Sequence, residues 1–130
     1  MKKEKRGKTK TTINRNFLSK WYTRIIGVYF LFIIISLFLD FTQFGHRPET
    51  YHKIFHILIG VIVIYHWNNK NFYRPFTAVS GAFFTFVAIF GWTFPNFALE
   101  IGLEAFTFSD TILHTIVGLT GLLIGVRAKK

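Results

Sequence analysis

Length, composition and charge restrict this chain to a few classes of protein. Its 130 residues suffice for one domain, 51% of them are hydrophobic, and 17 are phenylalanine. The chain has no cysteine, which excludes disulfides and thiolate metal sites. The formal net charge of +10 would suit a nucleic-acid partner. We expect none, because the basic clusters adjoin apolar blocks, where membrane orientation and anionic lipid account for them.

Residues 1–20 form the first segment, which is rich in lysine, arginine and threonine and has no apolar face. We predict a disordered cytoplasmic tail whose partner is anionic lipid. No small-residue cleavage site follows the first apolar block, so the block is read as a retained span and not as a cleaved signal peptide. Residues 128–130 form a second, shorter basic end.

Four apolar blocks make residues 21–127 a predicted membrane domain. The predicted spans are about 21–40, 51–67, 75–95 and 109–127. A bilayer core requires about 20 apolar residues, and the second and fourth blocks reach that length only with their histidine-bearing first turns. We predict four spans and not two, because two unpaired apolar blocks would have no place in water. The fold class is therefore an all-α integral membrane protein, a four-transmembrane-helix bundle, with a short interfacial helix between the last two spans.

The charges predict the orientation of this bundle. Of the 16 basic residues, 14 lie before the first span, between the second and third, or after the fourth, whereas five of the six acidic residues lie on the other side. The positive-inside rule then puts both termini in the cytoplasm of a multi-pass protein of the cell membrane. We expect several aromatic residues in the inner interfacial belt, namely Trp21, Tyr22, Tyr65, Trp67 and Tyr73.

Two motifs with the same spacing indicate an internal repeat. They are His52-x-x-x-His56-x-x-x-Gly60 and, 58 residues later, Asp110-x-x-x-His114-x-x-x-Gly118. In the first and third spans, Gly27 and Gly81 correspond with an offset of 54 residues. We predict two repeated helical hairpins of the same orientation, related by a pseudo-twofold axis along the membrane normal.

Residues three or four apart share one face of a helix, which places small and polar residues of these spans together. The predicted packing residues are Gly60, Gly81, Gly118, Gly121 and Gly125. The candidate metal ligands are His52, His56, Asp110 and His114. Because glycines let a neighbouring helix approach closely, the face that carries the ligands should point into the bundle.

Three imidazoles and a carboxylate suit zinc, iron, manganese or copper, and His56 and His114 at equivalent depths could also hold haem. The expected cofactor is therefore a transition metal ion or haem near the outer ends of spans two and four. Two alternatives stay open. The histidines could be polar packing in a scaffold or accessory subunit, which binds a membrane protein or a second copy of the chain, or they could serve proton or small-solute transfer. The sequence favours a protein that is not an enzyme, and any catalysis would have to use this site.

The two motifs resemble the signature of a bacterial family of small four-span membrane proteins classed as a domain of unknown function. The resemblance covers residues 21–126. It implies four helices in a bacterial inner membrane and brings no established activity or cofactor. This chain departs from the family in its more basic N-terminus and its higher phenylalanine content.

Overall fold

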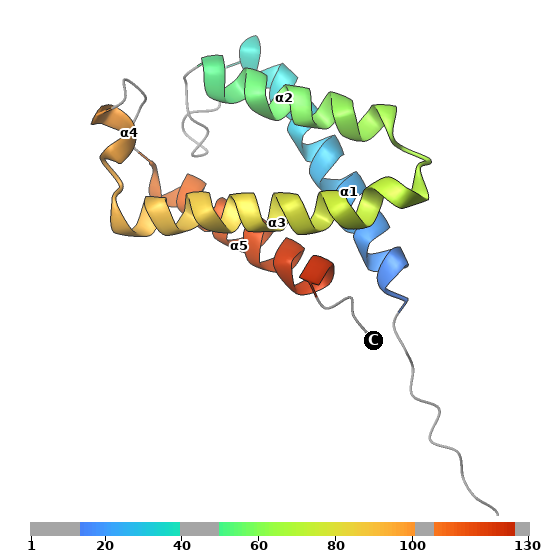
Figure 1. The fold of residues 1–130 in the computed structure, drawn as a ribbon. Helices are drawn as coiled ribbons and strands as arrows, with labels where there is room; N and C mark the ends of the chain where they lie inside the picture. Colours follow the sequence, from blue (N-terminus) through green and yellow to red (C-terminus); the bar gives the residue numbers. More distant parts are fainter. Residues whose placement is uncertain (1–13, 40–49, 101–105, 127–130) are drawn as a thin grey trace, which may run out of the picture.

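The chain folds into helices throughout the part that the computed structural model describes, which is residues 14–39, 50–100 and 106–126 (Figure 1). The elements are α1 (Arg15–Phe32), η1 (Ile33–Leu37), α2 (Thr50–Tyr65), α3 (Lys70–Thr93), α4 (Phe97–Glu100) and α5 (Phe108–Val126). The prediction of an all-α fold is confirmed. The short helix α4 lies in the connection where one was expected.

Three helical segments are long and apolar enough to cross a membrane: Asn16–Ile35, Lys70–Thr93 and Phe108–Val126. The helix α2 is apolar but shorter, with 16 residues. At 1.5 Å per residue it is about 24 Å long, against about 30 Å for a bilayer core. The length of α2 therefore sets it apart from the other three.

The helices begin earlier than the predicted spans, because polar first turns extend them. The helix α1 starts at Arg15, where the Asn14 side chain accepts a hydrogen bond from the backbone N–H of Asn16 (3.1 Å). The structure thus differs from the predicted tail at residues 15–20, which are helical; residues 1–13 lie outside the described residues. In the same way α3 starts at Lys70, with Asn69 as its N-cap. Asparagine at an N-cap satisfies a backbone donor that would otherwise lack a partner.

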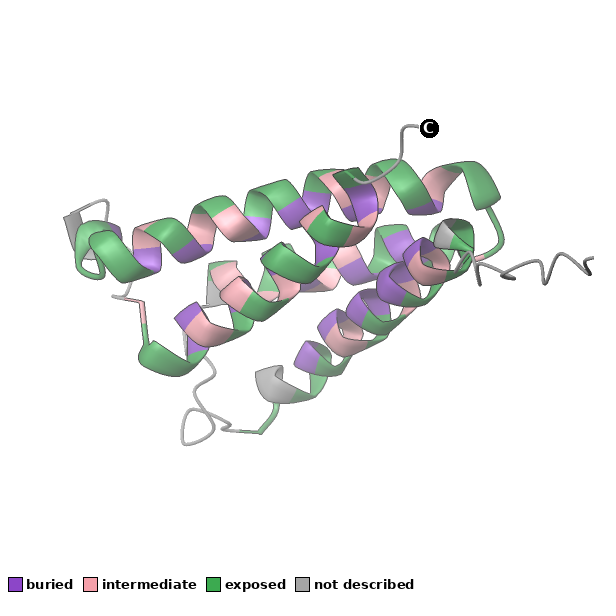
Figure 2. Ribbon diagram, turned by 90° about the horizontal axis from the view of Figure 1, so that it is seen from below, coloured by how far each residue is buried: buried purple, intermediate pink, exposed green. Residues whose placement is uncertain are grey.

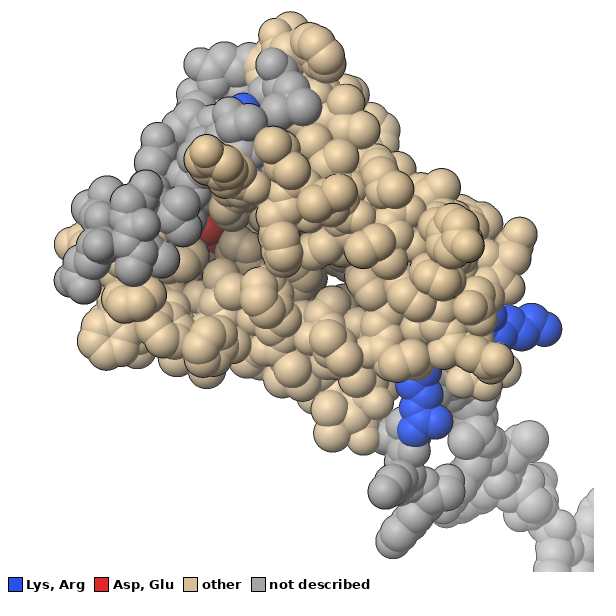
Figure 3. Space-filling view, turned by 45° about the horizontal axis from the view of Figure 1, so that its top comes forward, with Lys and Arg blue, Asp and Glu red and all other residues tan. Residues whose placement is uncertain are grey.

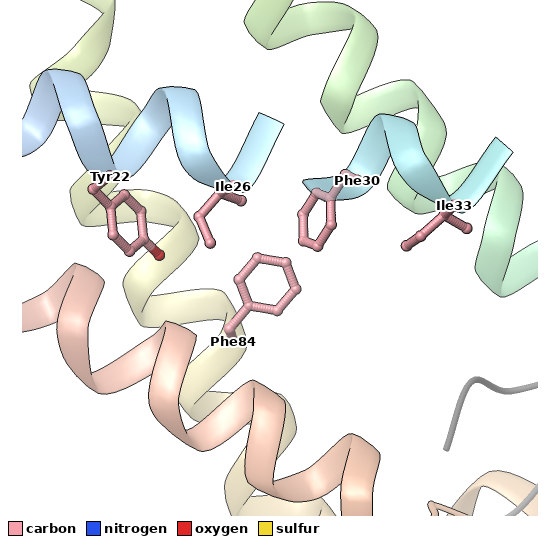
Figure 4. Packing of buried hydrophobic residues seen from close by; sticks show 5 residues of the cluster. All are labelled: Tyr22, Ile26, Phe30, Ile33 and Phe84. Atoms are coloured by element: carbon pink, nitrogen blue, oxygen red, sulfur yellow. The ribbon is translucent and has the colours of Figure 1, made fainter. Parts of the chain in front are cut away.

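The helix α1 lies between α2 on one side and the pair α3 and α5 on the other (Figure 1). Its buried side chains form the apolar core together with Phe84 of α3 (Figure 4). The core residues of α1 and η1 are Tyr22, Ile26, Phe30 and Ile33. Buried residues follow the inward face of each long helix, while exposed ones cover the outside (Figure 2). Large apolar side chains dominate that outer face, as a lipid environment requires.

Glycines bring α3 and α5 into backbone contact. A Cβ atom added at Gly81 would fall on the backbone of Gly121, and one added at Gly125 would lie 2.6 Å from the Cα atom of Ala78. On the other side of the bundle, a Cβ atom at Gly60 would lie 3.0 Å from the carbonyl oxygen of Gly27 in α1. Without side chains at these positions, the helices approach more closely than any other residue permits.

Hydroxyl groups connect α1 to its neighbours. The Tyr22 hydroxyl donates to the Val117 carbonyl (3.0 Å), and the Thr23 hydroxyl lies 3.3 Å from the Tyr73 carbonyl. Tyr22 and Tyr73 are both buried. The prediction that these two tyrosines belong to the interfacial belt is therefore wrong, since both lie inside the bundle, where their hydroxyls have backbone partners.

The glycine contact between α3 and α5 predicts a sharp difference between two neighbouring positions. Gly81→Leu should destabilise the bundle by about 1–3 kcal/mol or more, because overpacking forces the two backbones apart. Ala82→Leu adds the same side chain at an exposed position and should leave stability unchanged. Thermal unfolding of the two variants in detergent measures the difference. Equal midpoints would contradict the backbone contact.

Candidate metal centre

The candidate ligands lie in the first turns of α2 and α5. His52 and His56 are four residues apart on α2, and Asp110 and His114 are four apart on α5, so each pair points from one face of its helix. His56, Asp110 and His114 are buried, and the His52 side chain is 20% exposed. The two faces meet beside α1 and α3, so the structure brings all four predicted residues to one place.

The three imidazoles converge. One ring nitrogen from each of His52, His56 and His114 can be chosen such that all three lie within 4.8 Å of one another. The ring centroids of His52 and His56 are 4.3 Å apart, and those of His56 and His114 are 6.1 Å apart. The helices α2 and α5 therefore contribute ring nitrogens to one small volume, although few of their backbone atoms are close.

Asp110 lies beside this group of nitrogens and connects two of the rings. Its Oδ2 atom is 3.4 Å from Nδ1 of His114, and its Oδ1 atom is 3.9 Å from Nε2 of His52. The backbone N–H of Asp110 donates to the Thr107 hydroxyl (3.1 Å), which fixes the carboxylate in the first turn of α5. A carboxylate in this position orients a metal-binding imidazole through its second nitrogen.

The tautomer of His56 follows from its neighbour on α2. Nδ1 of His56 is 3.1 Å from the His52 carbonyl oxygen. A carbonyl only accepts hydrogen bonds, so Nδ1 carries the proton and Nε2 keeps its lone pair. This is the state in which a neutral histidine binds a metal.

Two phenylalanines form the wall behind the histidines. Phe30 of α1 lies 4.5 Å from His56 between ring centroids, and Phe84 of α3 stacks on His114 at 5.4 Å. Both are nearly fully buried. Sequence reasoning missed these two residues as part of the site. Their separation of 54 residues, the same as that of Gly27 and Gly81, is the signal that could have found them.

A cavity of about 40 Å³ adjoins the histidines, and Tyr29, Lys53 and Asp110 also line it. A water molecule requires about 10–15 Å³ by this measure, so the cavity has room for a metal ion with one or two waters. Haem requires a pocket of several hundred Å³, on the scale of small-molecule sites in general. The haem version of the prediction does not fit this cavity. Figure 3 shows an acidic side chain (red) recessed at this end of the molecule.

Comparison with protein-family models, curated proteins and solved structures found no match to this chain. The resemblance to a bacterial four-span family stays a prediction, and a function has to be inferred from the site itself.

The hydrogen bonds predict opposite tautomers for two histidines. His56 should carry its proton on Nδ1, because it faces a carbonyl. His66 should carry it on Nε2, because its Nδ1 faces the amide nitrogen of Asn69 (3.5 Å), whose oxygen already accepts from Asn71. Nitrogen-15 NMR of the metal-free full-length chain in micelles distinguishes the two forms. Finding the Nε2–H form at His56 would rule out the site as described.

Proposed function

We propose that the chain is a small integral membrane protein with four spans that binds one transition metal ion through His52, His56 and His114. The observation that carries the proposal is the convergence of three ring nitrogens within 4.8 Å on buried helix faces. Buried polar groups in a membrane protein are costly, so a cluster of three imidazoles calls for a shared partner. A metal ion supplies one.

The chemistry of the ligands narrows the choice of metal. Imidazole nitrogens suit zinc, copper, iron and nickel. Zinc binds histidine nitrogens at about 2.0–2.1 Å, which in a tetrahedron puts those nitrogens about 3.4 Å apart. The rings would therefore close by about 1 Å on binding. Three protein ligands leave one position toward the cavity, and Asp110 supports His114 from behind.

A second candidate is a scaffold or accessory subunit that is not an enzyme and whose histidines are purely structural. The packing of His56 and His114 against Phe30 and Phe84 favours this alternative, as does the carbonyl partner of His56. In that case the outer helix faces would bind another membrane protein or a second copy of the chain.

We also infer that the site joins two repeats, with α1 and α2 in one hairpin and α3 and α5 in the other. Corresponding contacts support this inference. The Thr23 hydroxyl lies 3.3 Å from the Tyr73 carbonyl, and the Thr77 hydroxyl lies 3.4 Å from the Ser19 carbonyl. Adding 54 to Ser19 and Thr23 gives Tyr73 and Thr77, so the two contacts exchange under a twofold rotation. Both helices run in the same direction, which puts the axis along the membrane normal.

The contacts of the second helix in each hairpin follow the same rule with an offset of 58. Phe30 contacts His56 as Phe84 contacts His114. Two further contacts have counterparts of this kind: Gly27 with Val63 corresponds to Gly81 with Gly121, and Gly60 with Leu31 corresponds to Gly118 with Thr85. The predicted metal site would then lie where the two hairpins meet.

The first prediction from this function is stoichiometric metal binding. Detergent-purified, metal-free protein should bind about one Co²⁺ or Zn²⁺ per chain, measured by cobalt absorption and elemental analysis. His56→Ala and His114→Ala should abolish binding, while His66→Ala, which removes a histidine outside the cluster, should leave it unchanged. Asp110→Asn should weaken binding by roughly 10–100-fold, as loss of a supporting carboxylate does elsewhere. Acid should release the metal, because protons compete for the ring nitrogens.

The metal experiment also separates the two candidate functions. Variants that keep the thermal midpoint of the parent chain but lose the metal support a dedicated site. A folded parent chain that binds no metal at any pH would leave the structural role of the histidines in its place.

The second prediction concerns orientation. We propose that both termini are cytoplasmic, since the described basic residues Lys20, Lys70 and Arg74 lie at the helix ends that face the N-terminus. A reporter fused after Lys130 should be active only in its cytoplasmic form, and one inserted at His46 only in its external form. An external C-terminus would contradict the arrangement with four spans.

A further inference from the structure

A second pocket lies at the opposite end of the helices from the histidines, between the first turns of α1 and α3. Its volume is about 590 Å³. Lys20 lines it from α1, and Lys70 and Arg74 line it from α3. Figure 3 shows blue lysine and arginine side chains at this end of the molecule, away from the red acidic side chain. Among the described residues that line the pocket, none is acidic.

The lining of this pocket combines charge with polar and apolar groups. Asn16 and Asn71 add amide groups beside the three cations, while Phe17 and Pro75 form an apolar edge. Lysine and arginine side chains held at a fixed spacing bind phosphate oxygens through charge-assisted hydrogen bonds. The pocket is therefore suited to a phosphate group attached to an apolar body.

The position of the pocket indicates where such a ligand comes from. The membrane-spanning segments Asn16–Ile35 and Lys70–Thr93 both begin at this pocket, which puts it at the level of lipid headgroups. Phe17 and Trp21 lie next to it with 56% and 46% of their surface exposed, and their rings are in contact at 6.1 Å. Exposed aromatic rings of this kind sit at the membrane interface.

We propose that this pocket binds the phosphate headgroup of an anionic membrane lipid, with Lys20, Lys70 and Arg74 as the residues that contact the phosphate. The apolar edge at Phe17 lies where the acyl chains leave the headgroup. This lipid site is separate from the metal site, and neither depends on the other. It differs from general attraction of lipid to the basic tail, because it requires three particular cations on two helices.

The test compares two sets of substitutions that remove the same charge. One variant carries Lys20→Gln, Lys70→Gln and Arg74→Gln, and the control carries Lys2→Gln, Lys3→Gln and Lys5→Gln in the tail. Each full-length protein is purified in detergent and titrated with phosphatidylglycerol or phosphatidylcholine. Native mass spectrometry then measures the fraction of chains with bound lipid, and thermal unfolding checks that each variant is folded.

The parent chain and the tail variant should both prefer phosphatidylglycerol over phosphatidylcholine. The pocket variant should lose that preference, with roughly tenfold weaker phosphatidylglycerol binding. Equal loss in the two variants would overturn the proposal, since it would indicate attraction by total charge. Unchanged binding in the pocket variant would overturn it as well. A third arm adds inorganic phosphate at millimolar concentration, and displacement of the lipid by phosphate would identify a site for the free anion.

Discussion

The close approach of α5 to α3 at their glycines is the contact on which the rest of the structure depends. Because Gly81 and Gly121 have no side chains, the two backbones touch, and the next turns of both helices are brought into register. This register places Phe84 of α3 against His114 of α5. The same ring of Phe84 faces Phe30 of α1 at 5.5 Å, so the apolar core and the candidate metal centre share one residue. A wider separation of α3 and α5 would move His114 away from the two histidines of α2.

Periodicity in the sequence predicted much of this arrangement, because spacing along a helix fixes which residues share a face. The i, i+4 spacing alone is enough to pair His52 with His56 and Asp110 with His114. The spacing could not tell whether Asp110 is a ligand or a support, since that depends on how far α5 is shifted along its axis relative to α2. The structure places its oxygens beside His114 and His52 and outside the group of converging nitrogens.

Other features depended on tertiary partners that no local pattern reveals. A tyrosine near the end of a span can lie at the interface or inside the bundle. Tyr22 lies inside because the Val117 carbonyl accepts its proton. Arg24 is a similar case: its guanidinium lies 4.4 Å from the centre of the Trp67 ring and donates to the Trp67 carbonyl (3.0 Å). Counted from the sequence, Arg24 is one more positive charge before the first span. In the structure it fastens α1 to the turn that follows α2.

The positions of His52 and Asp110 bear on how such a site can evolve. They correspond in the two proposed repeats, yet one is an imidazole and the other a carboxylate. In a dimer of identical hairpins, one gene would specify both positions, so a change to either would appear twice. Once the two hairpins are joined in a single chain, each position mutates alone. Gene fusion thus gives access to an unequal pair of side chains facing each other at 3.9 Å, which a symmetric ancestor could not have encoded.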